Sequence, residues 1–179
     1  MLGFHGCGKE VADRVITGAD DFRPSTKSYD WLGNGIYFWD RDPRRAYEFA
    51  MEKKSKVPSV VGAVIDPKNC LDLRCREGHE ILRAAYKAYC EEMGCPTQKN
   101  RSFSEGIPLR RDLDYVIIEA ACTMGSETSG KIDTVIGTFF EGKELYPGSG
   151  MRDKTHTQIC VRNPDCILGY FLPRNEKGN

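Results

Sequence analysis

Short apolar runs near the two ends of the chain predict β-strands. Leu2–Cys7 is an apolar run that the glycines Gly6 and Gly8 end, as in a buried strand that enters a turn. Ser59–Ile65 is rich in β-branched residues and stops at an Asp-Pro pair. The same reasoning predicts further strands over Gly35–Trp39, Cys70–Leu73, Ile132–Phe140, Gln158–Val161 and Cys166–Leu172.

Apolar residues at helical spacing predict helices between these strands. Lys9–Ile16 is a short amphipathic segment that ends before Gly18, and Pro43–Lys54 starts with the proline that helices favour in their first turn. Two more helices are expected over His79–Met93 and Leu113–Met124, and loops over Asp20–Asn34 and Glu91–Arg111. Because the long helices lie in the middle of the chain and the strands toward its ends, the pattern predicts an α+β fold rather than a regular βαβ alternation.

Length and charge narrow the class of protein. With 179 residues, 40% of them hydrophobic, the chain suits one domain over residues 1–179 with a packed core. Lys plus Arg and Asp plus Glu both number 26, so any nucleic-acid contact must be local. No run approaches the roughly 20 apolar residues that span a bilayer, and no secretion signal is evident, so we expect a cytoplasmic protein with no membrane partner.

The eight cysteines raise the question of metal binding. Cys70 and Cys75, then Cys90 and Cys95, share a spacing that resembles zinc ligation. Nothing in the sequence brings these four thiols together, and without an export signal we expect reduced cysteines and no metal. The basic residues Lys99–Arg101 and Arg110–Arg111 are expected in a solvated loop, with contact to a phosphate or a partner as the alternative.

The chain lacks the common catalytic motifs: a phosphate-binding loop, a dinucleotide fingerprint, a nucleophile elbow and a zinc-protease helix. Its distinctive feature is His5-Gly6 at the end of the first predicted strand, followed by Gly-Asn-Gly-Ile-Tyr-Phe over Gly33–Phe38. Aromatic Tyr47 and Phe49 come on the next predicted helix.

This combination resembles the NAD-binding half of the poly(ADP-ribose) polymerase-like, or diphtheria-toxin-like, ADP-ribosyltransferases. The resemblance is specific over residues 1–50 and weaker over the C-terminal strands. It implies a split, mostly antiparallel β-sandwich with flanking helices. It also implies a catalytic His, Tyr and Glu on three separate strands.

The resemblance assigns roles to individual residues. His5 would bind a ribose hydroxyl of NAD, and the backbone of Gly6 would hold the nicotinamide carboxamide. Tyr37 would stack on the cationic nicotinamide ring, with Tyr47, or Phe49 in its place, closing the other face. Arg44 stands where the family often has a small hydroxyl residue.

Gln158 occupies the position of the family's glutamate, so the triad becomes His5, Tyr37 and Gln158. A glutamine accepts a hydrogen bond from the ribose 2-hydroxyl but cannot act as a base. The resemblance therefore implies transfer of a single ADP-ribose, either to an acceptor that is already nucleophilic or with another base. His156 shares the face of Gln158 if the strand is regular. Candidates for the base are Glu141, Glu144 and Asp153.

The expected function is mono-ADP-ribosyltransfer from NAD, a co-substrate, to a protein, DNA or RNA acceptor. Compact members of this superfamily are often toxins or defence effectors, which implies a neutralising partner protein. One alternative is a catalytically silent module that binds NAD, ADP-ribose or a partner, and another is an NAD glycohydrolase. From the residues alone, His5 also suits a strand end satisfied by backbone, and Tyr37 and the two helix aromatics suit ordinary core positions.

Overall fold

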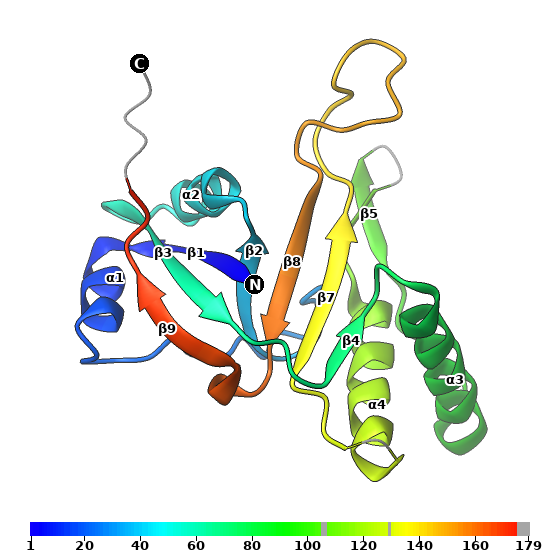
Figure 1. Ribbon diagram of the computed structural model, residues 1–179. Coiled ribbons are helices and arrows are strands. Elements are labelled where there is room, and N and C mark those ends of the chain that lie inside the picture. The colour runs from blue at the N-terminus through cyan, green and yellow to red at the C-terminus, as the bar shows by residue number, and fades with distance from the viewer. Residues whose placement is uncertain (105–106, 129, 175–179) are drawn as a thin grey trace.

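The computed structural model describes residues 1–104, 107–128 and 130–174 (Figure 1). Its helices are α1 (Lys9–Ile16), α2 (Pro43–Glu52), α3 (Arg76–Met93) and α4 (Asp112–Thr128). Its strands are β1 (Leu2–Gly8), β2 (Ile36–Asp40), β3 (Pro58–Ile65), β4 (Cys70–Asp72), β5 (Arg101–Ser104), β6 (Ile107–Arg110), β7 (Thr134–Phe139), β8 (His156–Val161) and β9 (Ile167–Phe171). A 3-10 turn, Pro164–Cys166, precedes β9.

Seven strands form one open, mixed sheet in the order β4-β7-β8-β2-β1-β3-β9. All neighbouring pairs are antiparallel except β4 and β7. β5 and β6 form a separate antiparallel pair beside α4 (Figure 1). The predicted α+β class is thus confirmed, and the strands are mostly antiparallel, as the resemblance implies, in one open sheet.

The sheet is weakest between β1 and β2. The ladder joining them has two residue pairs, Gly3 with Asp40 and Phe4 with Trp39, whereas β1 pairs with β3 over its whole length. Beyond Phe4 the two strands diverge, so the sheet is nearly parted at its centre. This parting positions the candidate site.

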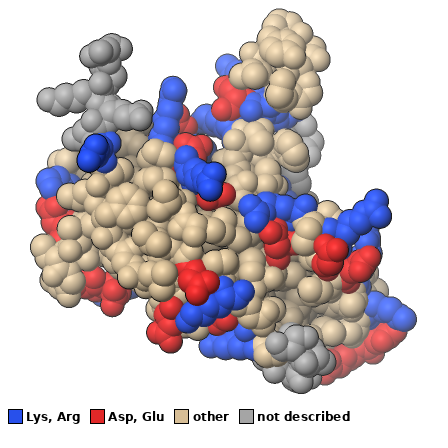
Figure 2. All heavy atoms as spheres, in the orientation of Figure 1, with Lys and Arg blue, Asp and Glu red and all other residues tan. Residues whose placement is uncertain are grey.

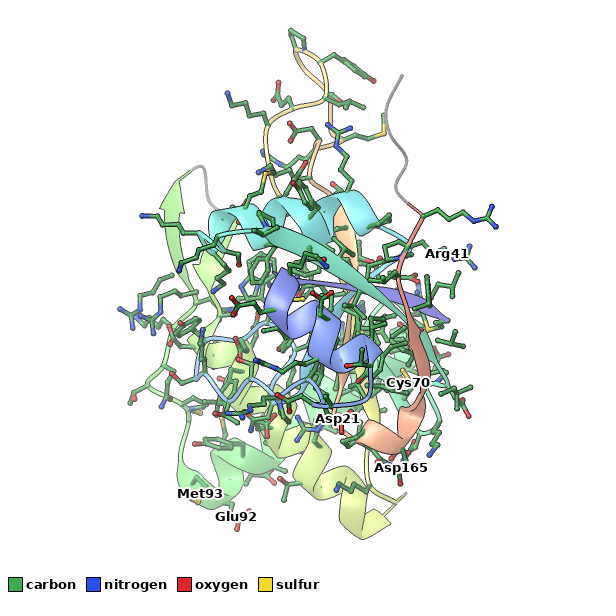
Figure 3. The ribbon with its side chains drawn as sticks, turned by 90° about the vertical axis from the view of Figure 1, so that its left-hand side faces the viewer. Asp21, Arg41, Cys70, Glu92, Met93 and Asp165 are labelled. Atoms are coloured by element: carbon green, nitrogen blue, oxygen red, sulfur yellow. The ribbon has the colours of Figure 1, made fainter. Side chains whose placement is uncertain are left out.

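Helices cover both faces of the sheet because side chains alternate along each strand. On one face α1 packs Ala12 and Val15 against Phe38 and neighbouring apolar residues. On the other face α3 and α4 cover β4 and β7, and α2 packs Ala46 against Trp39. Figure 3 shows α1 in front of the strands and, after it, the loop that carries Asp21.

Most predicted elements are found within a few residues of their expected bounds, and α1 has the predicted bounds. The prediction of a loop over Glu91–Arg111 is wrong, because β5 and β6 form a hairpin there. Pro108 and the charged and hydroxyl residues around it hide the period of two that marks a strand. Among the described helices, none is long and apolar enough to cross a membrane.

Candidate active site

A cavity of about 400 Å³ opens where β1 and β2 diverge. This volume lies within the range of small-molecule sites in proteins. His5 from β1, Tyr37 from β2 and Gln158 from β8 all line it. The structure therefore brings the three residues of the sequence-derived triad to one cavity, from three neighbouring strands.

His5 bridges the gap between the parted strands. Its Nδ1 lies 2.7 Å from the backbone oxygen of Tyr37, and its ring packs 4.1 Å from that of Phe22, centroid to centroid. Burial lowers the pKa of His5 more than the hydrogen bond to Tyr37 raises it, so the ring is neutral at pH 7. Because a carbonyl only accepts, Nδ1 carries the proton and Nε2 is an acceptor, with no hydrogen-bond partner among the described residues.

The backbone of Gly6 faces the same gap. At the two ends of the β1–β3 ladder, the Ile65 amide donates to the Met1 carbonyl and the Lys9 amide donates to the Val57 carbonyl. Hydrogen-bonded and non-hydrogen-bonded pairs alternate in an antiparallel ladder, so the odd-numbered residues of β1 bond to β3. The N–H and C=O of Gly6 consequently point away from β3.

At the start of β1 those outward groups have partners on the β2 side, as where the Arg41 amide donates to the Leu2 carbonyl. At Gly6 the ladder with β2 has already ended. Gly6 also lacks a side chain for a physical reason, since a Cβ there would lie 1.9 Å from the Ala46 carbonyl oxygen of α2. Gly6 is not among the residues that line the cavity, but its N–H and C=O point away from β3 and lie beyond the last β1–β2 residue pair.

The Tyr37 ring is held by its hydroxyl, which accepts from the Leu32 amide at 2.9 Å and donates to the Gly33 carbonyl at 2.7 Å. Burial raises the pKa of Tyr37 well above its usual value, so the phenol stays protonated. Because the hydroxyl is hydrogen-bonded to the loop, the ring is held in place where it lines the cavity.

A network of hydrogen bonds and one ion pair anchors the loop before β2. No local pattern in the sequence indicates this network. The Glu119 carboxylate accepts from the Asn34 amide at 2.8 Å and the Asn34 side chain at 3.0 Å, and pairs with both guanidinium nitrogens of Arg162. Burial raises the pKa of Glu119, but the Arg162 and Asn34 hydrogen bonds together hold it below the usual value. This partly buried ion pair fixes the chain that leads into Tyr37.

Gln158 lies at the centre of the sheet, paired with Trp39 of β2 and Gly137 of β7. Its side chain is half-buried and lines the cavity. Within the described part of the chain, nothing hydrogen-bonds to its amide. The amide is therefore available to a ligand.

Of the two aromatic residues expected to close the site, the structure brings Phe49 to the cavity and not Tyr47. Phe49 lines the cavity and packs 4.9 Å from Trp39, centroid to centroid, whereas Tyr47 is 43% exposed. Two residues are separated by about 200° around a helix, so both cannot face the same cavity. Arg44 is exposed on the outer side of α2.

The three carboxylates predicted as possible bases lie in different places, and one of them lines the cavity. Glu141 lines the cavity, near the buried guanidinium of Arg45. Glu144 accepts from the Gly148 amide in the exposed β7–β8 loop, and Asp153 accepts from the Lys143 amide. His156 is buried behind the cavity among Trp31, Trp39 and Phe139, and does not line it.

The remaining lining combines aromatic side chains with charges of both signs. Arg23, Ser25 and Lys27 lie on the wall formed by the loop before β2.

The described residues contain no group of three or more His, Cys, Asp or Glu side chains placed to hold a metal, and all eight cysteines are free.

Comparison with known proteins gives no match for this chain, whether against protein families, curated proteins or solved structures.

Proposed function

We propose that this chain is an NAD-dependent mono-ADP-ribosyltransferase whose NAD site is the cavity between β1 and β2. The observation that carries the proposal is the meeting of His5, Tyr37 and Gln158 at one cavity, beside the backbone groups of Gly6, which lie beyond the last β1–β2 residue pair. The near-parting of the sheet there also supports the split β-sandwich of the family that the motifs resemble.

Nicotinamide fits the groups at the parted strands. Its carboxamide has an acceptor oxygen and an NH₂ donor group, which complement the N–H and C=O of Gly6. The Tyr37 ring offers an aromatic face to the cationic pyridinium, and Phe49 provides apolar surface on the α2 side. The primary amide and the ring are thus recognised by different elements, β1 and β2.

The ribose and the phosphates would extend along the rest of the cavity. The Nε2 acceptor of His5 suits one ribose hydroxyl, and the amide oxygen of Gln158 suits the 2-hydroxyl of the nicotinamide ribose. Arg23 and Lys27 supply positive charge for the two phosphates.

Cleavage breaks the bond between the ribose anomeric carbon and the nicotinamide nitrogen. The electron pair leaves with nicotinamide, which becomes neutral, and the ribose develops positive charge. Gln158 directs a dipole rather than a full charge at that carbon and cannot take a proton from an incoming hydroxyl. For this reason the site favours a single transfer over elongation of a chain.

The wider setting of the protein follows from the resemblance. The acceptor would be a protein, DNA or RNA, and the activity would be that of a toxin or defence effector acting in the cytoplasm and held in check by a neutralising partner.

Two alternatives give different products. Loss of the glutamate at position 158 favours a silent module that binds NAD or ADP-ribose without cleaving it, and free access of water favours an NAD glycohydrolase. The silent module is stabilised by NAD and releases no nicotinamide, whereas the glycohydrolase releases nicotinamide and labels no macromolecule.

The test is release of nicotinamide from labelled NAD by the purified protein, with and without cell lysate as a source of acceptors. Tyr37→Ala is expected to lower the release at least tenfold, because a stacked aromatic contact contributes about 1 kcal/mol beyond its buried area and the loop loses its anchor. Tyr47→Ala is the matched control on the exposed side of α2 and should behave like the natural chain. Binding of NAD without any release, even with lysate, would contradict the transferase and leave the silent module.

A further inference from the structure

A second hollow adjoins the cavity and shares part of its wall. It holds about 450 Å³ and is lined by Arg45, Glu52, Glu141, Gly142, Lys143, Asp153 and Lys154. Arg45, Glu52 and Glu141 line both spaces. A molecule in the second hollow therefore meets the NAD cavity at these three side chains.

Glu141 is held at this boundary through one of its two oxygens. Oε2 accepts a hydrogen bond from Nη2 of the buried Arg45 at 3.1 Å, whereas Nδ1 of the buried His156, 3.6 Å away, donates to the Lys154 carbonyl. Over the described residues, Oε1 has no hydrogen-bond partner. The side chain of Glu141 is 16% exposed, so one oxygen is fixed while the other stays available in a largely enclosed place.

The neighbouring carboxylates differ from Glu141. Glu52 is 51% exposed, and its Oε1 is shared between Arg45 and Lys154 at 3.5 and 3.7 Å. Asp153 is occupied by the Lys143 amide and does not reach the NAD cavity. Glu52 and Glu141 both contact Arg45 and reach both spaces, but the Glu141 side chain is 16% exposed against 51% for Glu52, so Glu141 is the more enclosed of the two.

We propose that Glu141 is the general base for the acceptor, which approaches through the second hollow. This inference rests on the proposed transferase function. Gln158 would assist departure of nicotinamide and Glu141 would activate the nucleophile, so a residue of β8 and a residue of the β7–β8 loop share what one glutamate does in the family that the motifs resemble. Arg45 is a positioning residue, since it touches Oε2 and not the reacting atoms.

The step is balanced for a hydroxyl acceptor. The hydroxyl proton passes to Oε1 of Glu141 as the oxygen bonds to the anomeric carbon. The bond from that carbon to the nicotinamide nitrogen breaks, and its electron pair leaves on neutral nicotinamide. Glu141 then releases the proton to solvent. The products are an ADP-ribosyl O-glycoside, nicotinamide and one proton.

The experiment compares two small acceptors that differ in their need for a base. Methanol must lose a proton to react, whereas the azide anion has none to lose. NAD is supplied with each, and the methyl and azido products are measured for the natural chain, Glu141→Gln and the loop control Glu144→Gln. General-base catalysis contributes about 100-fold to 10,000-fold, so Glu141→Gln should lower the methyl product at least about 100-fold relative to the azido product. Glu144→Gln should leave the ratio unchanged.

An unchanged ratio of methyl to azido product in Glu141→Gln, whether both products fall equally or neither falls, would overturn the inference. If that variant does not fold, Glu141→Asp keeps the charge beside Arg45 and withdraws the carboxylate from the cavity. It should lower the methyl product more than the azido product, and equal effects on the two would overturn the inference. Failure of the natural chain to release nicotinamide with azide would instead overturn the proposed transferase function, and this inference with it.

Discussion

At the scale of single residues, an uncharged amide lines the cavity. Gln158 lies between β2 and β7 with its side chain free of protein partners among the described residues. In the proposed NAD site, a carboxylate there would place a full negative charge where positive charge develops on the ribose. An amide oxygen would offer only part of that stabilisation. For the proposed transferase, the identity of this one side chain would therefore limit the rate of bond cleavage.

Gln158→Glu is expected to increase nicotinamide release about tenfold or more, because a preorganised charge stabilises the developing cation more strongly than a dipole. Gln158→Ala, which removes the acceptor altogether, should fall below the natural chain. The rates are compared at saturating NAD, so that changes in binding do not enter. A lower rate for the glutamate variant than for the alanine variant would show that position 158 does not face the anomeric carbon.

The sequence indicates the residues of the triad better than their surroundings. His5, Tyr37 and Gln158 are identified by local motifs, which need no knowledge of packing. Whether Tyr47 or Phe49 faces the cavity depends on how α2 is rotated against Trp39, and periodicity alone leaves that open. The contact of Glu119 with Asn34 joins positions 85 residues apart, beyond the reach of any local pattern.

At the scale of elements, the contact between β1 and α2 sets the shape of the site. α2 starts with an Asp42 cap that accepts from the Arg45 amide, and it lies so close to β1 that only glycine fits at position 6. The same helix brings Phe49 and Arg45 to the cavity. Close packing of one helix on one strand thus places three parts of the proposed NAD site.

Gly6→Ala is expected to destabilise the fold by about 1–3 kcal/mol, because its new methyl group would overlap the Ala46 carbonyl and force α2 outward. In a domain of this size that corresponds to a fall in the thermal midpoint of several degrees. Gly169→Ala in β9 is the matched control, since nothing lies within 4 Å of the added carbon. Equal midpoints for the two variants would contradict the close approach of α2.

Element boundaries differ from prediction where glycine has a packing role. The predicted third helix starts at His79, whereas α3 begins at Arg76. Gly78 reads as a break in the sequence, yet it lies in the first turn of α3, where a Cβ would approach the Asp72 carbonyl oxygen to 2.0 Å. Such a glycine permits close contact with the preceding segment of the chain. This is a tertiary effect, which intrinsic helix propensities do not include.

At the scale of the whole molecule, the site lies at the parting of one sheet rather than on a charged surface. Lys and Arg are interspersed with Asp and Glu over the visible face, in keeping with a formal net charge of zero (Figure 2). The β7–β8 loop projects beyond the body of the fold (Figure 1), and Glu141 lies at its start. The sequence predicts the α+β class from element order, but the order of strands depends on contacts between the two ends of the chain.

The most direct test of the proposed NAD site is a crystal structure with an NAD analogue that cannot lose nicotinamide. The expected result places the carboxamide within hydrogen-bond distance of both the amide nitrogen and the carbonyl oxygen of Gly6. The pyridinium ring would lie on Tyr37, and a ribose hydroxyl would lie near Nε2 of His5. A dinucleotide bound away from the gap between β1 and β2, or no binding at all, would contradict the account.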